Sequence, residues 1–240
     1  MLELDGRRIE ARLPSRQGRL LFAFLTLGRD RAATRDELVD ALWPYAAPSA
    51  APASLTVLVS KLRAALGPET LAGRTELRLN LPPDTWIDVE NCLAAIHEAQ
   101  SAVALRDWKR AWGPALQAQF IARRPLLPEH DTPWLDNWRQ RLEDVHDLAL
   151  EAYSASCLGI GGTEVPGAER AARRLLERSP LRETGYALLM NALAAQGNVA
   201  EAMRVYERAR MTLDRELGIT PGQAIQEAHA RLLGISAAAP

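Results

Sequence analysis

The chain has 240 residues, 48% of them hydrophobic and 25% charged, a composition typical of a folded protein with one large or two smaller domains. Its 29 Lys and Arg residues nearly balance 30 Asp and Glu residues, so net charge alone does not indicate a nucleic-acid partner. Two distant cysteines exclude a disulfide framework, and the charged N-terminus and the absence of an apolar run of about 20 residues predict a cytoplasmic protein without membrane contact.

The first 42 residues predict a short hairpin followed by two helices. Weak alternation from Leu2 to Leu13 places a hairpin turn at "DGRR". Helical spacing then runs through Leu20, Ala23, Phe24 and Leu27, and Gly28 ends that helix. In "TRDELVDALW", Thr34 and Glu37 have the spacing of a capping box, and Leu38, Ala41 and Leu42 form the predicted buried stripe.

A third helix and a second hairpin follow a Pro/Ala-rich loop. The stretch "ASLTVLVSKLRAALG" predicts a helix to about Leu66, which Gly67-Pro68 ends. Two short extended segments then flank Ala72-Gly73-Arg74, and Pro82-Pro83 ends the second of them. Composition changes there, so we predict a first domain over 1–85 and a second, helical domain over 86–240.

The second domain contains an internal repeat of 34 residues. Ala168 in "GAERAARRLLERSP" corresponds to Ala202 in "VAEAMRVYERARMTLD", and Leu175 corresponds to Ala209. This period, with small residues where paired helices cross, is typical of tetratricopeptide (TPR) helical hairpins. The predicted fold class is therefore mainly α with a small β component.

No motif in the chain predicts catalysis, a cofactor or a metal. Nucleotide-binding and nucleophile motifs are absent, and "GIGGTEVPG" (159–167) is interpreted as a loop between repeat helices rather than an anion cradle. The histidines are scattered, and we place His146, in the acidic segment "EDVHD", on a solvated helix face rather than at a metal. Trp134 and Trp138, four residues apart, predict helix packing, with an aromatic ligand platform as the less favoured alternative. We therefore expect no enzyme activity.

Two segments carry a family resemblance. "RLLFAFLTLGRDRAATRDELVDALW", "ASLTVLVSKLRAALG" and "LNLPPDTWIDVE" resemble an OmpR-type winged helix, and "AMRVYERARMTLDRELGITPG" resembles the bacterial transcriptional activator domain that follows it. Together they resemble the SARP/AfsR transcriptional regulators across almost the whole chain. The resemblance implies that the third helix enters the major groove of double-stranded DNA and that the wing touches the adjacent minor groove or backbone. It also implies that the helical domain mediates homodimer or partner contacts, often with RNA polymerase.

The third helix divides into a core face and an outward face. Steps of 100° per residue put Leu55, Val59, Leu62 and Leu66 in the core and turn Ala53, Val57, Ser60 and Ala64 outward, flanked by Thr56 and Lys61. Only Lys61 has the reach for direct base readout, while Val57 suits a thymine methyl group. The candidate DNA-binding residues are Thr56, Val57, Ser60, Lys61, Arg63, Arg74, Arg78 and Arg35.

The charge of this region permits DNA binding without demanding it. Residues 1–80 carry 12 Lys and Arg against 9 Asp and Glu, a net charge of +3. For each candidate arginine a solvated surface charge is as good an interpretation as a phosphate contact, and Arg63 equally suits a salt bridge at the domain surface. We favour a transcriptional regulator, an activator, that binds DNA through the winged helix. The alternative is a protein-interaction module of the same architecture whose winged helix has lost or weakened DNA binding.

Overall fold

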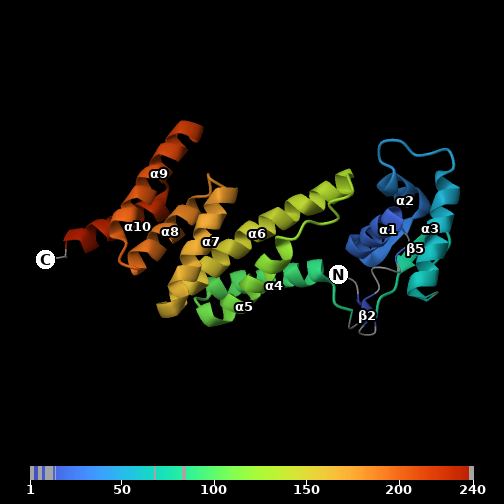
Figure 1. The fold of residues 1–240 in the computed structure, drawn as a ribbon, viewed down its shortest axis with the longest axis horizontal. Coiled ribbons are helices and arrows are strands. Elements are labelled where there is room, and N and C mark those ends of the chain that lie inside the picture. The colour runs from blue at the N-terminus through green and yellow to red at the C-terminus, as the bar shows by residue number, and fades with distance from the viewer. Residues whose placement is uncertain are drawn as a thin grey trace. The chain divides into compact units, whose positions relative to one another are not determined.

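The computed structural model describes residues 3–4, 7–8, 13, 15–67, 69–82 and 85–237. The chain forms two compact units, Met1–Asp88 with Pro125–Arg141 and Val89–Arg124 with Leu142–Pro240, whose elements are labelled in Figure 1. The predicted domain ranges 1–85 and 86–240 stay a prediction. The return of the chain to the N-terminal unit over Pro125–Arg141 has no counterpart in the sequence analysis.

The N-terminal unit has the architecture of a winged helix. Its helices are α1 (Ser15–Leu27), α2 (Arg35–Leu42) and α3 (Ala51–Leu66), with a short 3-10 turn, η2 (Arg29–Arg31), after α1. Strands β3 (Ala32–Thr34), β4 (Leu71–Ala72) and β5 (Glu76–Leu79) form an antiparallel sheet in the order β3-β5-β4. The predicted first hairpin is confirmed as β1 (Glu3–Leu4) paired with β2 (Arg7–Arg8). The sequence analysis missed β3, which extends the β4–β5 hairpin into a sheet.

The capping box of α2 is confirmed, but the predicted buried stripe of α1 is wrong. Thr34 accepts a hydrogen bond from the Glu37 backbone, and Glu37 Oε2 accepts from the Thr34 backbone N–H at 2.7 Å, which lowers the pKa of Glu37. In α1, Leu20 is buried as expected, whereas Ala23, Phe24 and Leu27 are only half-buried. Their places in the core belong to a neighbouring stripe of the helix, namely Leu21, Phe22 and Leu25.

The segment before and at the start of α6 (Pro133–Ile160) completes the core of the N-terminal unit. Leu135 is fully buried among the leucines of α1, α2, α3 and the sheet, with Leu126 and Leu127 packed at the edge. Trp134 donates its indole N–H to the Ala41 carbonyl at 3.1 Å and meets the Phe24 ring edge-on, with the ring centroids 5.1 Å apart. Packing is therefore confirmed for Trp134, and the buried partners come from the winged helix.

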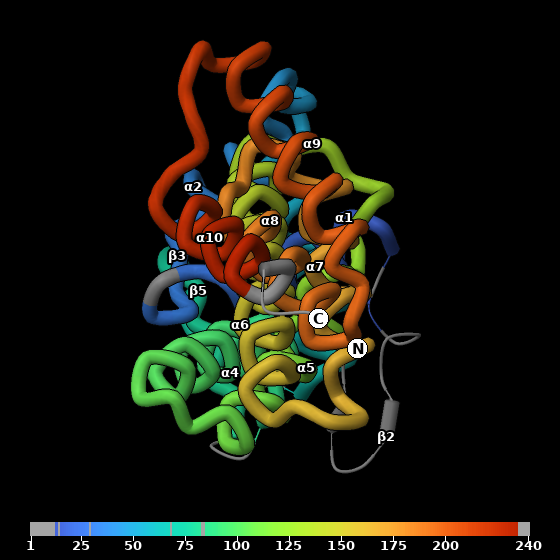
Figure 2. The backbone as a smooth tube through the Cα atoms, turned by 90° about the vertical axis from the view of Figure 1, so that its left-hand side faces the viewer, coloured from blue at the N-terminus to red at the C-terminus, as the bar shows by residue number. Residues whose placement is uncertain are grey.

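The C-terminal unit is built from consecutive helical pairs. Its helices are α4 (Asp88–Ala104), α5 (Trp108–Ala122), the later part of α6, α7 (Val165–Arg178), α8 (Glu183–Ala195), α9 (Val199–Leu217) and α10 (Gln223–Ala237). Figures 1 and 2 show α7, α8 and α9 side by side, with α10 against α8. The equivalent positions Ala168 and Ala202 are both fully buried, as are Leu175 and Ala209. Small residues at these positions let the paired helices approach closely, and the TPR-like prediction is confirmed.

His146 is the clearest correction to the sequence analysis. The prediction placed it on a solvated face, but its side chain is buried on α6, with 5% of the residue exposed. Burial, together with the charges of Arg178, Arg174 and Arg123, lowers its pKa to about 4. The acidic neighbours in "EDVHD" misled the prediction, because Asp147 is itself buried and pairs with Arg178 of α7 at 2.8 Å.

Candidate nucleic-acid interface

The outward face of α3 is an exposed surface with a small polar content. Leu55, Val59, Leu62 and Leu66 are buried, as the helical spacing predicts. The opposite face is exposed throughout and consists of Ala53, Thr56, Val57, Ser60, Lys61 and Ala64. Val57 is a large apolar residue on this face, 52% exposed. Within the described residues the Lys61 ammonium has no ion-pair partner.

The wing, β4 and β5 with the turn Gly73–Thr75, is fixed to α3 by Arg63. The Arg63 guanidinium donates from Nε to the Leu71 carbonyl at 2.8 Å and from Nη2 to the Gly73 carbonyl. Gly73 has a φ of +88°, and a Cβ there would lie 1.9 Å from the Glu76 carbonyl oxygen, so the turn requires glycine. Arg63 therefore holds the wing, a role that the sequence alternatives for this residue did not include.

Arg35, at the start of α2, connects three elements. Its backbone N–H donates to the Thr75 carbonyl at 3.1 Å, and its Nη1 reaches the Arg74 carbonyl at 3.5 Å. Its Nη2 donates to the Thr56 hydroxyl at 2.5 Å, and that hydroxyl donates in turn to the Pro52 carbonyl at 2.9 Å. Arg35 and Thr56 are thus brought together, but with one another and with backbone rather than side by side towards a ligand.

The remaining two arginines lie at different places on the wing. Arg74 is at the tip of the turn and exposed, and no side-chain hydrogen bond or ion pair of it occurs within the described residues. Arg78 lies on the outer face of β5, where Nη1 is 3.4 Å from the Asp30 carbonyl and Nη2 is 3.8 Å from Glu76 Oε1. Glu76 therefore offsets part of the charge of Arg78, while the charge of Arg74 is fully available.

Taken together, the eight candidates fall into two groups. Val57, Ser60, Lys61 and Arg74 are exposed on α3 and the wing tip without a side-chain partner in the described chain. Thr56, Arg35, Arg63 and Arg78 have intramolecular hydrogen bonds. The sequence showed which residues face outward but not which guanidinium groups are already bound, because those contacts depend on where the wing turn meets α2 and α3.

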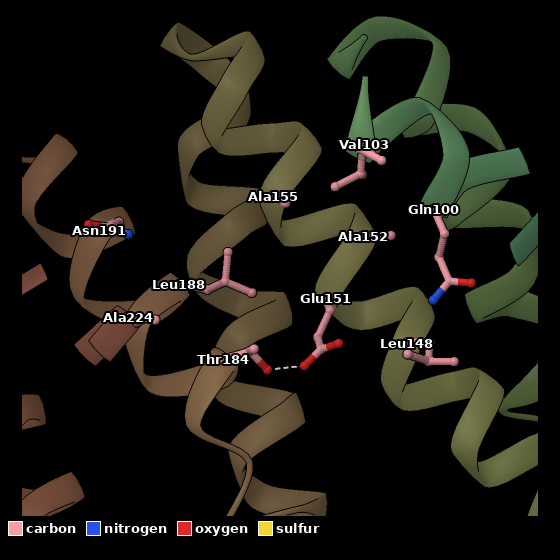
Figure 3. Close-up of a pocket in the computed structure, with 12 residues that line it drawn as sticks. Gln100, Val103, Leu148, Glu151, Ala152, Ala155, Thr184, Leu188, Asn191 and Ala224 are labelled. Atoms are coloured by element: carbon pink, nitrogen blue, oxygen red, sulfur yellow. Dashed lines mark hydrogen bonds between the residues drawn. The ribbon is translucent and has the colours of Figure 1, made fainter. Parts of the chain in front are cut away.

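A second hollow lies within the C-terminal unit. It has a volume of about 460 Å³ and is formed by α4, α6, α8 and the start of α10 (Figure 3). Small and apolar side chains such as Ala152, Ala155 and Leu188 make up most of its wall. Its carboxylate, Glu151, already accepts hydrogen bonds from Thr184 and from Arg182, the latter at 2.7 and 3.1 Å. The hollow therefore offers no unpaired carboxylate to a ligand.

The described residues contain no group of three or more side chains arranged to hold a metal ion. The segment 159–167 forms the end of α6, a short 3-10 turn (Gly162–Glu164) and the start of α7, and Glu164 accepts a hydrogen bond from the Trp112 indole at 3.1 Å. Among the described helices, none is long and apolar enough to cross a membrane.

Comparison with known proteins identifies the family. The model of the bacterial transcriptional activator domain matches residues 87–233, which is more than half of the chain. The chain belongs to this family. The resemblance to the SARP/AfsR regulators is thereby confirmed. This family member is 32% identical over 229 residues to the regulatory protein AfsR of Streptomyces griseus, an alignment that covers 91% of this chain and 22% of AfsR.

A further relative is known both as a sequence and as a structure. The transcriptional regulatory protein EmbR of Mycobacterium tuberculosis is 27% identical over 239 residues, covering 97% of this chain and 61% of EmbR. The structure of EmbR in complex with a low-affinity phosphopeptide superimposes with a TM-score of 0.79 at 26% identity, over 92% of this chain and 60% of the other. This family member therefore spans about three fifths of EmbR and about a fifth of AfsR.

Proposed function

We propose that this chain is a transcriptional regulator, an activator, whose winged helix binds double-stranded DNA. In this proposal α3 enters the major groove and the β4–β5 wing contacts the adjacent backbone. The observation that carries it is the pairing of an exposed, unpartnered Lys61 on α3 with an exposed, unpartnered Arg74 on a wing that is held against α2 and α3. A wing fixed at three successive residues presents its cation at a constant position, so little ordering is needed on binding.

The hydrogen-bonded arginines support this arrangement indirectly. Arg63 and Arg35 bind the carbonyls of Gly73 and Arg74, and the Arg35 backbone binds that of Thr75. In this proposal they position the wing relative to α3, while Lys61, Ser60, Val57 and Arg74 make the contacts. The names of AfsR and EmbR as regulators agree with this function.

The helical unit is proposed to bind a second copy of the chain or a protein partner such as RNA polymerase. Stacked helical pairs form extended surfaces that commonly serve protein contacts. The alternative function remains a module whose α3 face binds protein instead of DNA. It is favoured by the apolar outward residues Ala53, Val57 and Ala64, which suit a protein surface as well as a base edge.

The test is binding to duplex genomic fragments over a salt series from about 50 to about 300 mM. The Lys61→Ala and Arg74→Ala variants are compared with Lys109→Ala, which removes one positive charge from an exposed position on α5. We expect steep salt dependence for the parent chain. Arg74→Ala should lower the slope of log affinity against log salt by about one, while Lys109→Ala should leave it unchanged. No binding even at the lowest salt would contradict the proposal and favour the protein-binding alternative.

A further inference from the structure

The exposed face of α3 is poor in side chains that can read bases by hydrogen bonding. Direct readout in the major groove uses donors and acceptors on long side chains, or apolar groups against the thymine methyl. Thr56 has its hydroxyl occupied in both directions, because it donates to the Pro52 carbonyl and accepts from Arg35. The same contacts hold the Arg35 guanidinium beside the helix. Two of the polar candidates are therefore withdrawn from base readout.

Val57 occupies the middle of what remains. Ala53 lies one turn before it, and Ser60 and Lys61 lie one turn after it on the same exposed face. A β-branched side chain that is 52% exposed gains nothing from solvent, and its two methyl groups present a compact apolar surface. Ala53 and Ala64 add only methyl groups, so the face is shallow around Val57 and permits close approach of a flat ligand edge.

We infer that Val57 is a specificity-determining residue that packs against the C5-methyl group of a thymine in the major groove, with Lys61 contacting an adjacent base edge or phosphate. This inference rests on the proposed DNA binding and specifies its ligand as duplex DNA with a thymine at a fixed position of each half-site. Cytosine presents an amino group, and the purines present acceptors, where thymine presents its carbonyl and methyl group. Valine distinguishes thymine from these bases by contact rather than by hydrogen bonding.

The experiment isolates one methyl group. Binding sites are first selected from random-sequence duplex DNA, and each thymine of a selected site is then replaced singly by deoxyuridine, which removes only the C5-methyl. We expect one thymine in each half-site to lose about fourfold in affinity on this replacement, the effect of leaving one methyl group unburied. Replacement of the other thymines should change affinity little.

Val57→Ala tests whether Val57 reads that methyl group. In this variant the affinity ratio between thymine and deoxyuridine at the sensitive position should fall from about four to about one. Ser60→Ala is the matched control: it removes an exposed group from the same face, and the ratio should stay at about four. Val57 is exposed, so the variant should keep its fold, and its circular dichroism and urea midpoint should equal those of the parent chain.

The outcomes are distinguishable. If no duplex binds at low salt, DNA binding itself fails and the inference with it, and protein becomes the ligand of the α3 face. If duplexes bind but every deoxyuridine replacement is neutral, DNA binding stands and methyl readout is overturned. If the ratio of about four persists in Val57→Ala, another residue reads the methyl group and the assignment to Val57 is wrong.

Discussion

The arginines of the two units bind different acceptors. In the N-terminal unit, Arg35, Arg63 and Arg139 donate mainly to backbone carbonyls of turns and loops. In the C-terminal unit, Arg173, Arg178 and Arg182 pair with carboxylates, in each case including one on a neighbouring helix.

The difference follows from the lengths of the elements. The winged helix consists of short helices and strands of two to four residues, so many carbonyls lie in turns outside regular hydrogen bonding. The long helices of the C-terminal unit satisfy their own backbone and leave side chains as the remaining polar groups. Stability should therefore depend on guanidinium geometry in one unit and on carboxylate charge in the other.

The largest expected effect is at Arg178. Asp147 is buried and accepts from the Arg178 guanidinium and from the Ser179 hydroxyl. Arg178→Ala leaves that carboxylate with one donor, and we expect a loss of about 3 kcal/mol in the free energy of unfolding of the C-terminal unit. Urea unfolding followed by amide exchange over residues 165–235 measures it. Arg210→Ala, which breaks an exposed pair with Glu207, should cost below about 0.5 kcal/mol. Equal losses in both variants would remove the distinction.

A smaller effect is expected at Arg139 in the N-terminal unit. Its guanidinium binds the carbonyls of Leu126, Leu127 and His130, and Leu127 has a φ of +42°. Arg139→Ala should cost about 2 kcal/mol, seen as faster amide exchange in residues 15–82 and 125–141. Arg139→Lys should recover little, because an ammonium cannot reproduce the planar fork. Full recovery by lysine would show that charge, and not geometry, matters here as well.

The smallest effect concerns pH. The pKa of His146 is lowered to about 4 when folded, against about 6.5 when unfolded, so the unfolded chain binds the proton first as pH falls. The stability contributed by neutral His146 is present above pH 6.5 and is lost as pH falls towards 4. We expect His146→Gln to reduce the loss between pH 8 and pH 6 by about 1 kcal/mol. Urea midpoints at the two values measure it, and an unchanged pH dependence in the variant would contradict a buried neutral histidine.

Periodicity and capping predicted those parts of the fold that depend on local sequence. The capping box at Thr34, the core face of α3 and the 34-residue repeat follow from spacing alone. The contacts of Arg35 and Arg63 did not, because each depends on the position of a turn that is distant along the chain or folded back on α3. His146 was misplaced for the same reason: its burial depends on α7 and on the Arg178–Asp147 pair, and not on the polarity of its sequence neighbours.

One consequence concerns how this protein can be divided. Leu135 and Trp134 belong to the core of the winged helix, although about fifty residues of the other unit precede them in the chain. A protease cut after residue 85 would separate covalently two pieces of one hydrophobic core. The winged helix is therefore not an exchangeable cassette at the end of the chain. A recombination event that transferred only the first 85 residues to another helical domain would deliver a winged helix lacking Leu126, Leu127, Trp134 and Leu135.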